Sequence, residues 1–196
     1  EIDYGGAKMK IFDRERLMCE CLKYEDKMER AVFQEGVLSY IKDEKKNIAI
    51  MNKMEKENSV AIHLRKGADY LQSELMGKGL CGVEYYIKAI EYIKQNVDNP
   101  VFYVFTDNPE WVKNNLPKFD YILVDWNEVA GKKNFRDMQL MSCAKHNIIA
   151  NSTYSWWGAW LNPNPNKIVI GPTKFFNPIN KFFSSSDIMC EDWVRI

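Results

Sequence analysis

From residue 59 onward the sequence alternates short apolar runs with longer amphipathic stretches, and this alternation constrains the fold more than any other feature. The apolar runs occupy residues 59–64, 101–106, 121–125, 147–151 and 167–171. Each run is short and lacks the alternation of a half-exposed strand, which is typical of strands buried on both faces. Such strands separated by helices predict right-handed crossovers and an α/β fold, a Rossmann-like parallel sheet with helices on both faces.

The stretches between the apolar runs have the pattern of helices. Residues 83–97 place their isoleucines and Tyr86 on one stripe, as an amphipathic helix does. The pair Asn108-Pro109 is typical of a helix N-cap followed by proline in the first turn. Residues 135–146 and 152–162 complete the series.

The first 58 residues differ in kind from the rest. They are rich in Lys, Glu and Met, and residues 24–58 have the pattern of two charged amphipathic helices. We therefore divide the chain into a helical lead-in, residues 1–58, and an α/β domain, residues 59–196.

Composition excludes several classes of partner and cofactor. The 27 Lys and Arg balance 27 Asp and Glu, so we expect no nucleic-acid partner, whereas a small anionic ligand fits. The five cysteines include no Cys-x-x-Cys pair, and the two histidines cannot form a histidine cluster, so we expect no disulfide framework and no zinc site. Without an Asp-x-Asp pair, the sequence favours chemistry that needs no metal cofactor.

Polar residues gather where the predicted strands end. They are His63, Arg65, Lys66, Asp69, Thr106, Asp107, Asn151, Ser152, Thr153, Tyr154 and Ser155. In open parallel sheets, ligands bind beyond the carboxyl ends of the strands. Residues 152–155 begin a helix, whose free N–H groups form a phosphate cradle. Arg65 offers a bidentate grip on phosphate oxygens, and Lys66 offers a second charge.

Each of these residues also has a structural explanation. A Ser or Thr before a helix is usually an N-cap, and an Arg-Lys pair after a strand is usually a solvated loop charge. Asp107 also suits a turn. Their convergence on one sheet edge is what favours an anion or nucleotide site over these alternatives.

Three blocks of this sequence resemble, in order, the motifs of a known enzyme family. They are HLRKGADY (63–70), FYVFTDNPEWVKNN (102–115) and MSCAKHNIIANSTYSWWGAWLNPNPNKIVIGP (141–172). These blocks are similar to those of the inverting α-1,2-fucosyltransferases, glycosyltransferase family eleven, and the resemblance covers about residues 59–196. It implies the donor half of a metal-independent GT-B enzyme that binds GDP-fucose. Such an enzyme moves L-fucose to the 2-hydroxyl of a terminal galactose on a glycan acceptor, with inversion.

The resemblance also implies roles for individual residues. His63 and Arg65 would line the diphosphate site, together with the donor-binding residues named above, and Arg65 would stabilise the departing GDP. Lys66 stands where the family commonly has a second Arg, and Ala68 adds a residue before Asp69. The catalytic base would be Glu74, by the spacing of related α-1,6-fucosyltransferases. Glu74 as a solvated charge and Asp69 as a residue that orients the loop remain alternatives.

The family's amino-terminal block, Gly-Gly-x-Gly-Asn-Gln, is not reproduced by Gly5-Gly6. By resemblance, residues 1–58 would be a remnant of the acceptor-side domain, and this chain would bind donor without turnover if that domain were absent. A fucosyltransferase of another linkage and a non-catalytic nucleotide-sugar binding module remain open. Unpaired cysteines and the absence of an apolar run of about 20 residues favour the bacterial cytoplasm, with peripheral contact at the inner face of the membrane.

Overall fold

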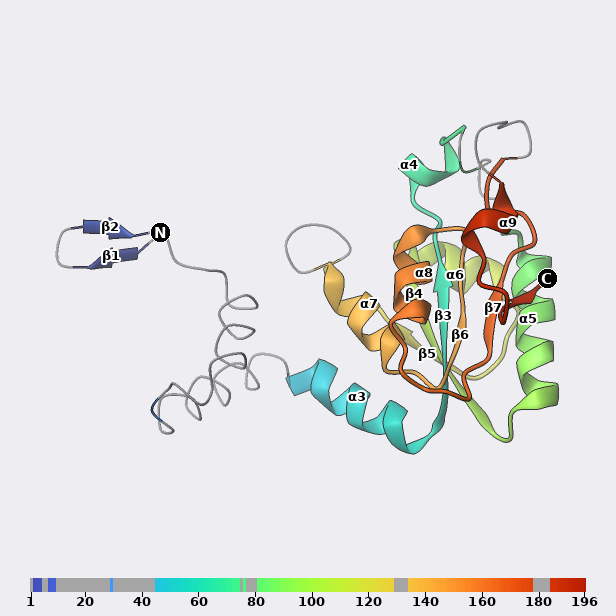
Figure 1. Ribbon diagram of the computed structural model, residues 1–196, viewed down its shortest axis with the longest axis horizontal. Coiled ribbons are helices and arrows are strands. Elements are labelled where there is room, and N and C mark those ends of the chain that lie inside the picture. The colour runs from blue at the N-terminus through green and yellow to red at the C-terminus, as the bar shows by residue number, and fades with distance from the viewer. Residues whose placement is uncertain are drawn as a thin grey trace. The chain divides into compact units, whose positions relative to one another are not determined.

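The structure, a computed structural model, describes residues 2–4, 7–9, 29, 45–74, 76, 81–128, 134–177 and 184–196 (Figure 1). The chain divides into two compact units, residues 1–49 and 50–196. In the first unit, β1 (Ile2–Tyr4) and β2 (Ala7–Met9) form an antiparallel pair. The sequence did not predict this pair of strands, because each strand is too short to show a pattern. Of the two helices predicted over residues 24–58, the second is α3 (Lys45–Lys56), and the first lies outside the described residues.

The second unit contains a six-stranded, wholly parallel sheet, as the sequence predicts. Its strands are β3 (Asn58–Leu64), β4 (Pro100–Thr106), β5 (Tyr121–Val124), β6 (His146–Ile148), β7 (Val169–Gly171) and β8 (Val194–Arg195). The spatial order is β5-β4-β3-β6-β7-β8, which is the doubly wound order of a Rossmann-like sheet. The chain therefore reverses its winding direction between β3 and β6, and ligands of such sheets bind at this switch point.

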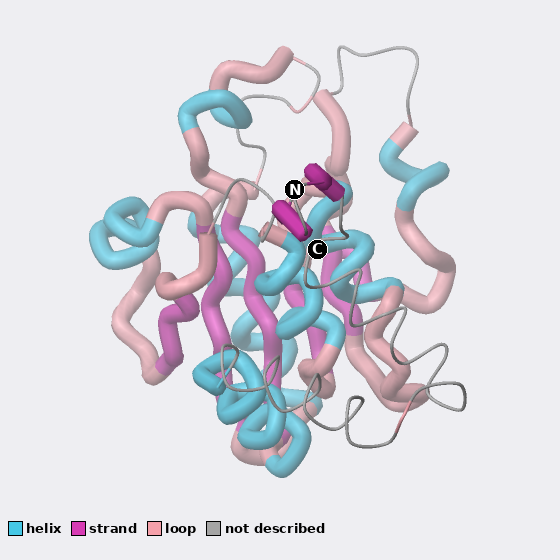
Figure 2. The backbone as a smooth tube through the Cα atoms, turned by 90° about the vertical axis from the view of Figure 1, so that its left-hand side faces the viewer, coloured by secondary structure: helices cyan, strands magenta, loops and turns pink. Residues whose placement is uncertain are grey.

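Helices cover both faces of the sheet, as Figure 1 shows for α5 (Val83–Asn96) on one side and α3 with α7 (Phe135–Ser142) on the other. The remaining helices of the described residues are α4 (Ala68–Leu71), α5 (Val83–Asn96), α6 (Pro109–Asn115), α7 (Phe135–Ser142), α8 (Thr153–Trp160) and α9 (Ser185–Ile188). Figure 2 shows the strands side by side among these helices. No helix in the described part of the chain has both the length and the apolar character that a membrane span requires.

Strand β3 is buried on both sides, which explains its unbroken apolar run. Val60, Ile62 and Leu64 pack against α5 and α6, whereas Ala61 packs against α3 and α7. Successive side chains of a strand point to opposite faces. His63 is therefore directed to the face of the sheet that carries α7, and it comes to lie beside α8.

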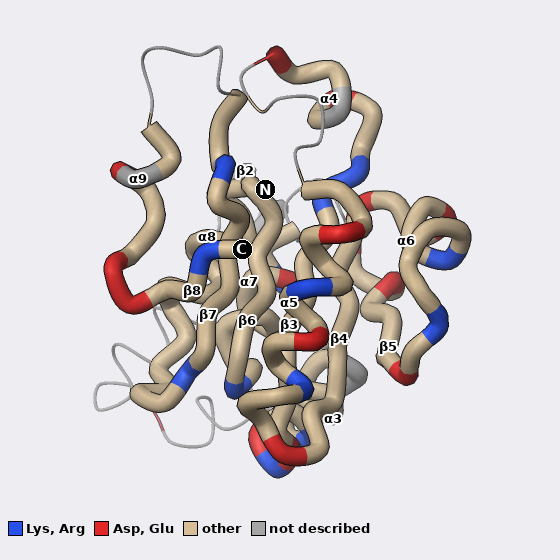
Figure 3. The backbone as a smooth tube through the Cα atoms, turned by 90° about the vertical axis from the view of Figure 1, so that its right-hand side faces the viewer, with Lys and Arg blue, Asp and Glu red and all other residues tan. Residues whose placement is uncertain are grey.

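Three predicted strands are longer than the observed ones, and the run 121–125 exceeds β5 only by its last residue. The run 147–151 becomes β6, which ends at Ile148, and the run 167–171 becomes β7, which begins at Val169. Ile149 N still donates to Ile170 O at 2.9 Å, and then the chain leaves the sheet towards α8. Figure 3 shows Lys and Arg interspersed with Asp and Glu over the backbone, and the full chain has a net charge of zero.

Candidate functional site

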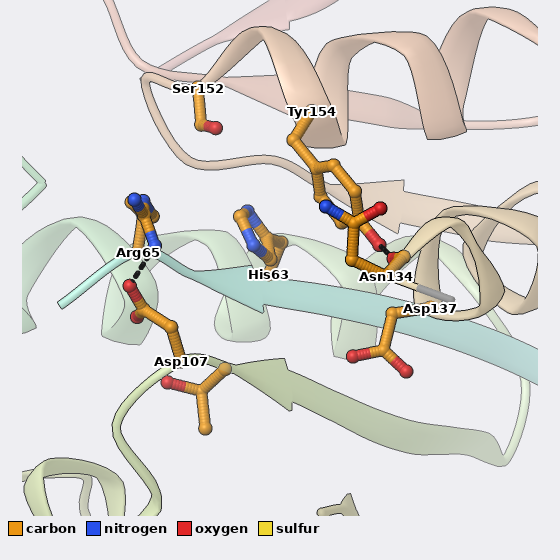
Figure 4. A pocket seen from close by; sticks show the side chains of 8 residues that line it. His63, Arg65, Asp107, Asn134, Asp137, Ser152 and Tyr154 are labelled. Atoms are coloured by element: carbon orange, nitrogen blue, oxygen red, sulfur yellow. Dashed lines mark hydrogen bonds and ion pairs between the residues drawn. The ribbon is translucent and has the colours of Figure 1, made fainter. Parts of the chain in front are cut away.

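A cavity of about 210 Å³ opens at the carboxyl ends of β3 and β4, against the first turns of α7 and α8. It is lined by His63, Arg65, Thr106, Asp107, Asn134, Asp137, Ser152 and Tyr154. In Figure 4, Arg65 and Asp107 lie at one side, Asn134, Asp137 and Tyr154 at the other, and His63 between them. The pocket thus occupies the switch point of the sheet, where the topology predicts a ligand.

Asp107 holds the loop that follows β3. One carboxylate oxygen accepts from the Lys66 N–H at 2.6 Å, and the other accepts from the Gly67 N–H at 2.8 Å and from the Arg65 guanidinium. A side chain at position 67 would collide with this carboxylate, so glycine is required there for steric reasons. The second Arg65 nitrogen donates to Asp69 Oδ2 at 2.6 Å. The guanidinium is therefore fixed at the mouth of the pocket by two carboxylates.

His63 forms the floor of the pocket and carries unused hydrogen-bonding capacity. Its side chain is only 5% exposed, and its Nδ1 has no hydrogen-bond partner among the described residues. Its ring centroid lies 5.6 Å from that of Tyr154. Burial lowers the pKa of His63 to about 4, helped by the positive charge of Arg65 and opposed by Asp107. The imidazole is consequently neutral at pH 7 and contributes a polar group without a charge.

The opposite end of the pocket is acidic. Burial raises the pKa of Asp137 to about 6, although the amide of Asn127, which donates to Asp137 Oδ1 at 2.7 Å, partly offsets this effect. The Tyr154 hydroxyl accepts from the Met138 N–H at 3.0 Å and donates to the Asn134 carbonyl. Tyr154 thereby ties the first turn of α8 to the start of α7, which brings Asp137 to the pocket.

Six of the predicted site residues line the pocket: His63, Arg65, Thr106, Asp107, Ser152 and Tyr154. Ser152 occupies the N-cap position of α8, but its side chain makes no capping hydrogen bond. The first N–H groups of an α-helix have no partner within the helix. The Ser152 hydroxyl is therefore not used in capping, and the first turn of α8 contributes Ser152 and Tyr154 to the pocket lining.

Lys66 and Asn151 point away from the pocket. The Lys66 side chain is 4% exposed, and its ammonium donates to the Cys81 carbonyl at 2.7 Å and lies 4.5 Å from the Trp111 ring centroid. The Asn151 amide donates to the carbonyls of Met76 and Phe175 at 3.0 and 3.2 Å. Both residues hold loops around the site.

The other predicted residues also lie outside the pocket lining. The Ser155 hydroxyl donates back to the Ser152 and Ala150 carbonyls, and Thr153 is exposed at the start of α8. Asp69 lies on α4 with its ion pair to Arg65, and Glu74 is exposed on the loop beyond α4. The two candidate bases are thus on the segment that follows β3, and Asp69 is connected to the site through its ion pair with Arg65.

Sequence reasoning missed Asn134 and Asp137. An acidic residue in the first turn of a helix is common because it interacts favourably with the helix dipole, so Asp137 carried no distinguishing signal. Among the described residues, no three His, Cys, Asp or Glu side chains are grouped so that they could hold a metal ion.

Comparison with known proteins gives consistent matches. The sequence model described as Glycosyl transferase family 11 matches residues 23–196. An α-1,2-colitosyltransferase of Escherichia coli is 43% identical over 141 residues, which is 71% of this chain and 48% of the relative. The O-antigen biosynthesis glycosyltransferase WbnK of Escherichia coli is 40% identical over 147 residues, 72% of this chain and 46% of the relative. The human galactoside α-(1,2)-fucosyltransferase 1 is 25% identical over 139 residues, 70% of this chain and 38% of the relative. The chain thus spans about half the length of the curated bacterial relatives that it matches.

Proposed function

The chain belongs to glycosyltransferase family 11, and from this premise we propose that it provides the donor site of an inverting, metal-independent α-1,2-fucosyltransferase. In this proposal GDP-fucose occupies the pocket between β3 and α8, and L-fucose passes to the 2-hydroxyl of a terminal galactose on a glycan. Relatives named galactoside α-(1,2)-fucosyltransferase support this reaction. No nucleic acid takes part.

The observation that carries the proposal is the polarity of the pocket, with Arg65 at one end and the buried carboxylate of Asp137 at the other. Guanosine diphosphate has the complementary polarity. Its diphosphate is anionic, and its base presents two adjacent donors, N1–H and the 2-amino group, which one carboxylate can accept together. Adenine and uracil do not present such a pair. Because the pKa of Asp137 is about 6, this carboxylate is mostly ionised at pH 7.

The diphosphate end combines three kinds of donor. Arg65 presents a planar fork that matches two phosphate oxygens, and its position is fixed by Asp107. The first turn of α8 contributes backbone N–H groups and the positive end of the helix dipole. The neutral His63 supplies a further polar contact. The cavity of about 210 Å³ is smaller than typical ligand sites of about 300–1,000 Å³, so the sugar extends beyond it to the exposed rim.

The mechanism follows from this placement. As the bond between the anomeric carbon and the β-phosphate oxygen breaks, negative charge grows on GDP, and Arg65 with the α8 N–H groups stabilises it without a metal. The acceptor hydroxyl attacks from the opposite side of the sugar ring, which inverts the configuration. A carboxylate on the segment after β3, Asp69 or Glu74, accepts the hydroxyl proton.

A second candidate function is transfer of colitose, which is L-fucose without the 3-hydroxyl. The relative with 43% identity, named α-1,2-colitosyltransferase, favours it. Both functions use the same guanine nucleotide and linkage. A non-catalytic nucleotide-sugar binding module is the remaining alternative. The name of WbnK, an O-antigen biosynthesis glycosyltransferase, supports a polysaccharide intermediate as the acceptor, and we propose that this chain works on it at the inner face of a bacterial membrane.

Thermal denaturation with nucleotides tests the donor. At GDP near a hundred times its dissociation constant, binding stabilises the folded chain by about 2.7 kcal/mol, which raises the midpoint by roughly 5–11 °C. UDP and ADP at the same concentration serve as matched controls and should give smaller shifts. Equal shifts with all three nucleotides, or no shift with GDP, would overturn the guanine assignment.

Transfer to a β-galactoside then separates the candidates. GDP-fucose and GDP-colitose are supplied in parallel, and the product linkage is determined. Fucose on the 2-hydroxyl supports the first function, and colitose transfer supports the second. A linkage to another hydroxyl contradicts both, and donor binding without transfer or donor hydrolysis favours the binding module.

A further inference from the structure

The two carboxylates that hold Arg65 have very different surroundings. The Asp107 side chain is 11% exposed and also accepts two backbone N–H groups, those of Lys66 and Gly67. The Asp69 side chain is 72% exposed, and among the described residues its one recorded ion pair is with Arg65, at 2.6 Å. Asp107 is therefore held by the backbone of the loop as well as by Arg65, whereas Asp69 is held by Arg65 alone among the described residues.

The cost of leaving Arg65 differs accordingly. If Asp107 moved, two backbone N–H groups would lose their acceptor in a largely buried place, which is expensive. If Asp69 moved, water would replace the guanidinium at an exposed carboxylate, and exposed ion pairs contribute little. An anion that competes for Arg65 would therefore displace Asp69 more easily than Asp107.

We propose that Asp69 occupies the place of a donor phosphate on Arg65, and that the diphosphate exchanges with it while Asp107 keeps the guanidinium in position. This inference rests on the proposed function, because it takes the diphosphate of the donor as the arriving anion. Asp107 is then a positioning residue that acts through Arg65, and Asp69 is a competitor for the phosphate subsite. Replacing Asp69 by Asn should therefore tighten the binding of phosphate groups, whereas replacing Asp107 by Asn should weaken it.

Isothermal titration of the full chain with GDP, pyrophosphate and guanosine tests this exchange. Asp69→Asn should tighten the binding of GDP and pyrophosphate by about two- to fivefold, the range that an exposed ion pair allows, and leave guanosine unchanged. Asp107→Asn should weaken GDP binding about tenfold or more. Glu91→Gln is the matched control, because it removes one negative charge from an exposed position in the middle of α5. It should leave all three affinities unchanged.

A double-mutant cycle distinguishes competition from a general charge effect. If Asp69 acts through Arg65, Asp69→Asn should not tighten pyrophosphate binding when Arg65 is already replaced by Gln. Tightening that persists in the Arg65→Gln background overturns the inference, as does an Asp69→Asn chain that binds GDP and pyrophosphate no better than the wild type.

Failure of the proposed function has a different signature. If the donor is not a guanine nucleotide, the wild-type chain binds UDP or ADP as tightly as GDP, and the pyrophosphate measurements still decide the role of Asp69. Thermal melts of each variant identify any loss of folding. If Asp107→Asn does not fold, Asp69→Asn and the cycle with Arg65→Gln decide the outcome without it.

Discussion

The two ends of the parallel sheet both carry polar side chains and a cavity, yet they differ in how their hydrogen-bonding groups are used. At the amino end a cavity of about 400 Å³ lies between α3, the end of α7 and the segment after α8. Its two asparagine side chains from the segment after α8 are engaged in the fold. Asn162 donates to the Ala144 carbonyl at 2.7 Å and to Asn147 Oδ1 at 2.8 Å, and Asn164 donates to the Lys145 carbonyl at 2.9 Å.

The cavity at the carboxyl end is smaller, about 210 Å³, but its polar groups are less completely paired. His63 Nδ1 has no partner among the described residues, one of the two carboxylate partners of Arg65 is exposed, and burial raises the pKa of Asp137. The comparison teaches that cavity size does not identify the site. Unused hydrogen-bonding capacity does, because buried polar groups without partners are costly unless a ligand satisfies them.

The largest expected effect is on function at the carboxyl end. Arg65→Lys keeps the charge but loses the fork that can meet two phosphate oxygens. We expect the rate of transfer to fall about a hundredfold or more, comparable to the loss of one oxyanion donor. The measurement is turnover at saturating donor, on an enzyme that includes the acceptor side.

The matched control is Arg195→Lys, the same chemical change at an exposed position of β8. It should leave turnover unchanged. Near-normal turnover of Arg65→Lys would show that Arg65 is a structural cation. The carboxyl end of the sheet would then not differ from the amino end in the way that we propose.

At the amino end the expected effect is on stability. Asn162→Ala leaves the Ala144 carbonyl and Asn147 Oδ1 without their donor in a buried place. We expect a loss of about 2 kcal/mol in the free energy of unfolding, and a fall in the thermal midpoint of roughly 4–8 °C. GDP affinity should not change.

Asn96→Ala is the corresponding control, because its amide donates to the Tyr92 carbonyl on the exposed side of α5. It should change stability by less than about 0.5 kcal/mol. If Asn162→Ala lowered GDP affinity while the fold stayed intact, the amino end of the sheet would contribute to ligand binding as well as to stability, which contradicts the comparison.

Asp137→Asn tests ligand binding and stability at one residue. The amide cannot accept the paired donors of guanine as a carboxylate does, so GDP binding at pH 7.5 should weaken about tenfold. Wild-type affinity should also fall as the pH drops below about 6, the pKa of Asp137, whereas the affinity of the variant should change less over this range. Titration calorimetry between pH 5 and pH 8 provides the comparison.

The Asp137 contribution to the stability of the wild-type chain should change with pH in the direction opposite to GDP affinity. The pKa of Asp137 is raised from 3.8 to about 6 by burial, so its contribution to stability is full below 3.8 and is lost as the pH rises through 6. Asp137→Asn should therefore have a higher thermal midpoint than the wild type at pH 7.5, and this advantage should shrink towards pH 4. A variant that is less stable than the wild type at pH 7.5 contradicts the assignment of Asp137 as a strained site residue.

The smallest expected effect is that of chelation. The charge on the departing GDP is stabilised in our proposal by Arg65 and the α8 N–H groups, so treatment with EDTA should leave transfer unchanged. Activity that is lost with EDTA and regained only with added Mg²⁺ or Mn²⁺ would show that the carboxyl end is incomplete without a metal.

The sequence predicted the central strands closely. The runs 59–64 and 101–106 correspond to β3 (Asn58–Leu64) and β4 (Pro100–Thr106), because strands buried on both faces must be apolar throughout. The predicted cap at Asn108 is confirmed, since its Oδ1 accepts from the Trp111 N–H at 3.0 Å. The sequence did not predict β8, α4 or α9, whose two to four residues are too few to show a period.

By itself, then, the sequence determined the Rossmann-like class and the polar residues that follow β3, β4 and β6, because hydrophobic period and strand ends are local properties of the chain. Only the tertiary structure decided which of these residues meet. His63 and Arg65 line the pocket, whereas their neighbours Leu64 and Lys66 are buried outside it. Successive side chains of an extended chain point in opposite directions, which explains this alternation. Asp137 reaches the same pocket from α7, because the sheet order places β3 beside β6 and Tyr154 ties α7 to α8. Contacts between segments so far apart in the chain depend on packing, which no local pattern records.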